Sequence, residues 1–447
     1  MISSRPAFPS RTTHRPGSRS LPDMIVWLVS HLFSFETLFT GFLYSNAYKQ
    51  LLPPLPADET VIFAALCIPV AIWIILRDGL YIPGLHTTVA FFVFVGWVVV
   101  TYSWTPSQVL AKESITYLVT FGVLSVVSGA CVIAPSRERT VRFLVAILIA
   151  SLVLSVYGSI IYIQYGTFRF YEGFVQRTYL LWGHAAAGGA VIAFAIAIYS
   201  KFGTPKQVIV GGIFLIMAYF LMIATSRGAL LSLAGACFLP LLISRAVIRE
   251  RYFGLPQWLF ALILFIVILI AYSVHVLISG EQLGTFGRFI KLFNQVDNPD
   301  LVLSANRFAY FQAAVAQWLE NPILGGGVNS FTIYFSGREI GGTIPHNLFL
   351  ELLSQYGLVG TVIFAIFAFT GLRHATLTRL REDPLLLCVL MMFTGRLIGT
   401  MFGKDLPFQH PLLACMGLLC LRPPPPPQAR SRTQVRRVSV ERRQAAA

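Results

Sequence analysis

The chain has 447 residues, of which 56% are hydrophobic and only 12% are charged. Soluble domains usually carry about 25% charged residues, so this composition excludes an ordinary soluble protein and indicates a membrane protein. The net charge of +15 does not indicate nucleic acid, because the basic residues gather in two tails and in short loops.

Hydrophobic stretches near the roughly 20 residues that cross a bilayer recur along the chain. We predict an all-α polytopic integral membrane protein in which residues 24–421 form one transmembrane domain. Its twelve spans are expected near 25–45, 60–76, 86–104, 115–134, 140–163, 184–200, 207–224, 228–244, 256–278, 347–372, 385–402 and 409–421. Residues 1–23 and 422–447 are rich in Pro, Ser and Arg, which is typical of disordered basic tails beside anionic lipid.

The loops between these spans have a charge bias. With the N-terminus in the cytoplasm, the five short inner loops carry twelve Lys and Arg residues and the five short outer loops carry six. This bias follows the positive-inside rule and places both termini in the cytoplasm. One long loop, about 279–344, then lies outside, together with Arg227 and His346.

The outer loop contains a helical pattern. Phe308, Phe311, Val315 and Trp318 recur at helical spacing, which predicts an amphipathic helix over 306–320 at the membrane surface. Arg307 stands in its first turn, where unpaired backbone N–H groups favour an anion. Two further outer-loop cations, Arg288 and Arg338, are expected to attract an anionic lipid headgroup.

Two short motifs flank this helix in the sequence. Pro322-Ile323-Leu324-Gly325-Gly326-Gly327 permits tight turns or close approach of the backbone to a ligand, and both interpretations stay open. Thr225-Ser226-Arg227-Gly228-Ala229 joins two spans with almost no loop. Its arginine either reaches toward lipid headgroups or holds a phosphate group in a bidentate way.

His346 follows Pro345 at the start of a predicted span. An imidazole with an ordinary pKa of about 6.5 suits proton transfer near neutral pH. Asn347 and Glu351 are four residues apart and share one helix face, so both are expected to help position a substrate. The alternative is a passive, hydrogen-bonded histidine.

Other candidates carry less weight. Arg396 lies inside a span, where an arginine must pair or line a cavity, and is treated as a supporting residue. His184 is interpreted as a packing residue, and the six cysteines as small core residues. The eight histidines are scattered, so no metal or other cofactor is expected.

His346-Asn347, followed after nine residues by Gly357-Leu358-Val359-Gly360, resembles the bacterial O-antigen ligase and polymerase superfamily. Three more segments match in order: Ser103-Trp104, the Arg227 segment, and Asn306-Arg307 with its downstream glycines. The resemblance implies a metal-independent glycosyltransferase of the bacterial inner membrane. Its donor would be a glycan on undecaprenyl diphosphate, and its acceptor lipid A-core or a growing polysaccharide such as an exopolysaccharide.

Specific roles also follow from this resemblance. His346 would activate the acceptor hydroxyl on the periplasmic side, and Arg227 and Arg307 would neutralise the diphosphate leaving group. A transporter or flippase of lipid-linked sugars is the main alternative, although no repeat of two related halves is visible in the sequence. A scaffold subunit of a glycan export complex would have no need of these three residues.

Overall fold

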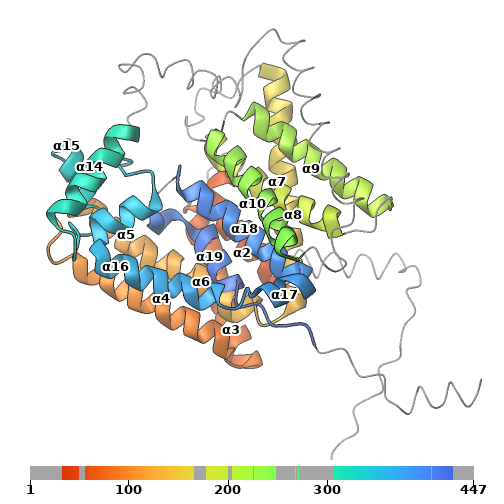
Figure 1. The fold of residues 1–447 in the computed structure, drawn as a ribbon, viewed down its shortest axis with the longest axis horizontal. Coiled ribbons are helices and arrows are strands. Elements are labelled where there is room, and N and C mark those ends of the chain that lie inside the picture. The colour runs from red at the N-terminus through yellow and green to blue at the C-terminus, as the bar shows by residue number, and fades with distance from the viewer. Residues whose placement is uncertain are drawn as a thin grey trace, which may run out of the picture.

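The computed structural model describes residues 33–49, 56–165, 178–199, 204–224, 226–247, 307–403 and 405–425, together with 267 and 270. All regular secondary structure in these residues is helical (Figure 1). The helices are α2 (Phe35–Tyr48), α3 (Glu59–Asp78), α4 (Ile82–Thr101), α5 (Val109–Tyr117), α6 (Val123–Val127), α7 (Arg137–Tyr165), α8 (Thr178–Tyr199), α9 (Pro205–Ile223), α10 (Arg227–Val247), α14 (Arg307–Glu320), α15 (Ser330–Ser336), α16 (Leu348–Leu372), α17 (Leu377–Glu382), α18 (Pro384–Thr400) and α19 (His410–Leu418).

Three short helical segments complete the list. The π-helical turns η1 (Leu118–Gly122) and η2 (Ser128–Ile133) lie within one continuous helix that begins with α5, and the 3-10 turn η3 (Leu406–Phe408) precedes α19. The predicted all-helical fold is confirmed for the part of the chain that the structure describes. Five of the six cysteines are buried, in agreement with their interpretation as core residues.

Seven helices in the described ranges are long and apolar enough to cross a membrane. Eleven of the predicted spans overlap a helix, whereas 256–278 falls outside the described residues except for 267 and 270. The count of twelve spans therefore stays a prediction. The tail 1–23 and most of 422–447, which were predicted to be disordered, also lie outside the described residues.

The last predicted span differs from the expectation of one full crossing. α19 has nine residues and is almost entirely buried. At about 1.5 Å per residue it covers roughly 14 Å, less than half of a bilayer core of about 30 Å. The chain turns between Met401 and Gln409 and reaches α19 through a 3-10 turn, so the helix begins late.

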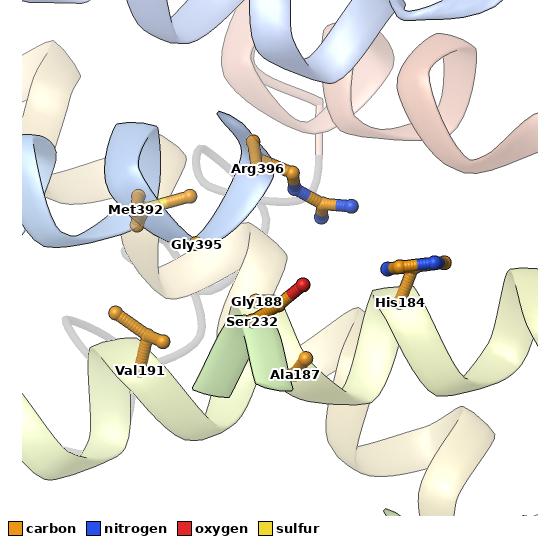
Figure 2. A pocket seen from close by; sticks show the side chains of 8 residues that line it. All are labelled: His184, Ala187, Gly188, Val191, Ser232, Met392, Gly395 and Arg396. Carbon is orange, nitrogen blue, oxygen red and sulfur yellow. The ribbon is translucent and has the colours of Figure 1, made fainter. Parts of the chain in front are cut away.

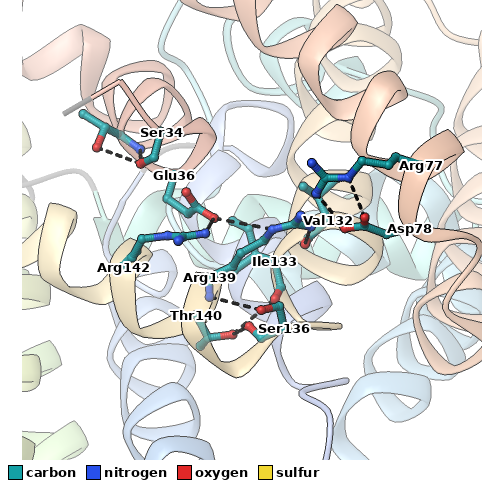
Figure 3. A network of polar contacts seen from close by, with 11 residues as sticks. Ser34, Glu36, Arg77, Asp78, Val132, Ile133, Ser136, Arg139, Thr140 and Arg142 are labelled. Carbon is teal, nitrogen blue, oxygen red and sulfur yellow. Dashed lines mark hydrogen bonds and ion pairs between the residues drawn. The ribbon is translucent and has the colours of Figure 1, made fainter. Parts of the chain in front are cut away.

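Glu36, an acidic residue in the first predicted span, is paired inside the bundle (Figure 3). Its carboxylate lies 3.2 Å from Arg142 Nη2 and 3.9 Å from Arg139 Nε. Arg139 also bonds Asp78 at 2.7 Å, which connects α2, α3 and α7. A buried carboxylate is tolerated because its charge is compensated in this way.

Helices α8, α10 and α18 pack against one another, and α16 packs along α4 (Figure 1). α14 and α15 lie together near the start of α16, so the amphipathic segment joins the bundle at that end. The predicted helix over 306–320 is confirmed as Arg307–Glu320. It buries Ala314 and Gln317 and exposes Phe308, Val315 and Leu319, as expected of a helix with one apolar outer face.

Candidate functional site

The three residues predicted to perform chemistry all stand at helix starts. Arg227 and Arg307 are the first residues of α10 and α14, and His346 precedes Asn347, the N-cap of α16. Helix N-termini carry partial positive charge and unpaired N–H groups, so each start favours an anion nearby.

One turn of the chain, Phe402-Gly403 after α18, contacts all three helix starts. His346 Nδ1 lies 3.0 Å from the Gly403 carbonyl oxygen. The Arg307 guanidinium carbon lies 5.9 Å from the centre of the Phe402 ring. A Cβ placed on Gly228, the neighbour of Arg227, would be 3.1 Å from Phe402 Cβ. The structure therefore brings the three elements together.

The contact with Gly403 sets the chemistry of His346. A carbonyl oxygen only accepts, so Nδ1 carries the proton and donates it. In the neutral ring Nε2 is then the nitrogen that accepts a proton, as a general base requires. The His346 backbone has φ +53, which is uncommon for a non-glycine residue. The centre of the His346 ring lies 5.7 Å from the centre of the Tyr310 ring.

Asn347 and Glu351 occupy supporting positions. The Asn347 side-chain oxygen accepts from the backbone N–H groups of Phe349 and Leu350 at 3.0 and 3.2 Å, and so caps α16. The buried Glu351 carboxylate accepts from the Leu406 N–H at 2.9 Å. Glu351 thereby holds the connection that carries Phe402-Gly403. Direct contact of either residue with substrate stays a prediction.

The glycine-rich turn repairs a break in α16. Gly357 interrupts this helix with φ 65 and ψ −169. The carbonyls of Ser354 and Gln355 accept instead from the N–H groups of Gly326 and Gly327, at 2.9 and 2.8 Å. Beyond the break, the N–H groups of residues 358 and 359 donate to the carbonyls of residues 322 and 323. Segment 322–327 thus replaces two interrupted helical hydrogen bonds.

This close approach explains the glycines. A Cβ on Gly325 would lie 2.4 Å from Gly357 N, and one on Gly327 would lie 2.7 Å from Thr105 Cβ. Both residues have positive φ. Of the two interpretations of this motif, the tight turn is the one that the structure shows.

The turn after α4 holds the same glycine segment from the other side. Trp104 Nε1 donates to the Gly325 carbonyl at 3.2 Å, and Thr105 Oγ1 donates to the Val328 carbonyl at 2.6 Å. The predicted Ser103-Trp104 motif therefore supports the glycine segment 322–327.

Glu339 fastens this segment to α5, and sequence reasoning missed it. Its carboxylate accepts from Ser107 Oγ at 2.8 Å and from the backbone N–H groups of Gln108 and Val109. Burial raises the pKa of Glu339, but these hydrogen bonds outweigh burial and hold the pKa below its ordinary value. Arg338 beside it is exposed, and Arg288 lies outside the described residues.

Residues 212–365 match a family model described as O-Antigen ligase. This match supports the predicted resemblance to the O-antigen ligase and polymerase superfamily. The matched region includes Arg227, Arg307, His346 and the break in α16, whereas Phe402-Gly403 lies beyond it. No curated protein matches the chain.

This similarity supports a ligase-like or polymerase-like membrane enzyme that acts on lipid-linked glycans and polysaccharides. It does not support the transporter alternative. Phe402 and Gly403 were absent from the predicted site because a phenylalanine next to a glycine carries no chemical signal in the sequence.

Proposed function

We propose that the chain transfers a glycan from undecaprenyl diphosphate to a sugar hydroxyl on the periplasmic side of the bacterial inner membrane. The observation that carries this proposal is the meeting of Arg307, His346 and the start of α10 at Phe402-Gly403. One cation, one base and the helix start that carries Arg227 meet around a single turn, which suits transfer from a diphosphate leaving group.

The reaction is a displacement at the anomeric carbon of the donor. The acceptor oxygen bonds to this carbon while its proton passes to Nε2 of His346. The bond between the anomeric carbon and the phosphate oxygen breaks, and the electron pair leaves with undecaprenyl diphosphate. Arg307 and Arg227 stabilise the negative charge that develops there, since guanidinium groups bind phosphate oxygens in a bidentate way.

The hydrogen bond to Gly403 assists this step. Because Nδ1 donates to a carbonyl, the imidazolium that forms keeps a partner for one of its two protons. The same bond orients Nε2 away from Gly403. Proton transfer by a positioned side chain typically contributes about 10²- to 10⁴-fold to a rate.

The test is a glycan profile of a deletion strain complemented with wild type, His346→Gln or His346→Ala. The glutamine variant keeps a polar side chain but cannot take up a proton, so we expect surface glycan to be lost with both variants while membrane insertion is unchanged. Normal glycan from either variant refutes the assignment of the base.

The same strain separates the two reactions of the superfamily. Accumulation of long lipid-linked polymer, with none on lipid A-core, identifies a ligase. Accumulation of single lipid-linked repeat units identifies a polymerase.

A further inference from the structure

A small cavity lies between α8, α10 and α18, and Arg396 faces it (Figure 2). His184 and Ser232 line the cavity with it, and their side chains point toward the same hollow as the guanidinium. The hollow has room for about one water-sized group, which is also the size of a single phosphate oxygen.

Among the described residues, Arg396 has no acidic partner. Its Nη2 donates to Tyr44 Oη at 2.6 Å, and no carboxylate within the described part of the chain lies at ion-pair distance. A guanidinium has five N–H donors, so one hydroxyl leaves most of its capacity unused. An intramembrane cation in this condition marks a functional site.

The cytoplasmic-side arginines of the predicted topology give a useful contrast. Arg137, Arg139 and Arg142 each pair with a carboxylate, at distances of 2.5 to 3.2 Å. These arginines elsewhere in the bundle are therefore paired with carboxylates. At Arg396 the bundle supplies a hydroxyl and an open space.

Gly188 keeps that space open. A Cβ at this position would lie 2.8 Å from Arg396 Nη2 and 3.1 Å from Tyr44 Oη. Any larger residue would push the guanidinium away from Tyr44. The absence of a side chain here is a requirement of the pair and of the cavity beside it.

His184 connects the cavity with the proposed active site. A Cβ on Gly399 would lie 3.1 Å from His184 Cε1, and one on Gly228 would lie 3.8 Å from the same atom. Gly228 also contacts Phe402, so only one layer of residues separates the two places. Arg396 lies near the C-terminal end of α18, six residues before Phe402.

We infer that Arg396 and His184 bind the lipid-proximal phosphate of the undecaprenyl diphosphate donor. This inference rests on the proposed function. The glycan of the donor points outward and its tail enters the bilayer, so the phosphate next to the tail lies deeper than the one next to the sugar. Arg307 and Arg227 hold the outer phosphate, and Arg396 contacts an oxygen of the inner one.

The test is equilibrium binding to the purified full-length protein in lipid nanodiscs. The probes are undecaprenyl diphosphate, undecaprenyl monophosphate and inorganic diphosphate. A charge-assisted hydrogen bond to a phosphate corresponds to roughly 10- to 100-fold in affinity. Arg396→Gln should therefore lower the affinity for both lipid probes by about that factor. Arg307→Gln should lower the affinity for undecaprenyl diphosphate more than the affinity for the monophosphate, because the monophosphate lacks the outer phosphate.

Arg373→Gln is the matched control. It removes one positive charge at the C-terminal end of α16, where Arg373 bonds His86, away from the proposed site. If Arg396→Gln lowers the melting temperature, Gly188→Ala is the alternative variant. It keeps the charge but displaces the guanidinium, so it should also lower the affinity for both lipid probes.

Unchanged binding of undecaprenyl monophosphate to both Arg396→Gln and Gly188→Ala overturns the inference. A loss of binding that is confined to inorganic diphosphate also overturns it, because this result would indicate a site for free anions. Binding requires no transfer, so loss of activity in His346→Ala with normal binding in Arg396→Gln refutes this site alone.

Discussion

Replacing Phe402 by leucine removes the aromatic face beneath the Arg307 guanidinium and keeps a side chain against Gly228. The guanidinium carbon lies 5.9 Å from the ring centre, close to the limit of about 6 Å for a cation–π contact. Such a contact is then worth about 0.5–1 kcal/mol, at the lower end of the usual range. At about 1.36 kcal/mol per tenfold change in rate, we expect kcat/KM to fall roughly two- to fivefold.

The kinetic pattern distinguishes positioning from substrate binding. If Arg307 stabilises charge that develops on the leaving group, the loss falls on kcat and KM stays near the wild-type value. Phe402→Tyr keeps the ring face and should retain full activity. The assay is in vitro transfer from a purified lipid-linked donor by protein in nanodiscs.

A double-mutant cycle completes this test. Because Phe402 is proposed to act through Arg307, Phe402→Leu should have no further effect in an Arg307→Ala background. Equal loss in both backgrounds, or full activity of Phe402→Leu alone, would show that the ring does not position Arg307.

Two further changes test the segment 322–339. Gly325 has φ +74, and Gly325→Ala places a Cβ 2.4 Å from the backbone N of Gly357. We therefore expect the free energy of unfolding, measured by thermal unfolding, to fall by about 3 kcal/mol or more. Gly341→Ala has open space and should unfold like wild type, and equal melting of the two variants would contradict the tight approach. The lowered pKa of Glu339 means that its contribution to stability is present above the ordinary carboxyl value of 4.5 and is lost as the pH falls through the folded-state value. Glu339→Gln should therefore flatten the acid side of a melting-temperature profile between pH 6 and 3, and an unchanged slope would argue against this cap.

Local patterns in the sequence were enough to predict the helix starts. Arg307 precedes an apolar stripe at helical spacing, and the structure begins α14 at that residue. His346 and Asn347 precede an apolar run, and Asn347 caps α16. Charge placement and capping act over a few residues, so they can be inferred without knowledge of the rest of the fold.

The partners of these residues could not be predicted in the same way. His346 bonds a carbonyl 57 residues further along the chain. Any residue has a carbonyl, so nothing in the sequence marks Gly403. The glycines at 325–327 indicated a turn, but the location of that turn against the break in α16 depends on packing between segments distant in sequence. The shortness of α19 has the same origin, because a 3-10 turn whose Leu406 and Pro407 are buried precedes its start.

Because segment 322–327 completes the hydrogen bonding of α16, this segment and the helix form a single structural unit. An exchange of this segment with the corresponding segment of an O-antigen ligase should therefore treat 322–330 and 354–359 as one cassette. A segment grafted alone would leave two carbonyls and two N–H groups of α16 without partners in a hydrocarbon environment. Loop exchanges that respect this boundary are expected to insert and fold, and those that cut across it are expected to be degraded.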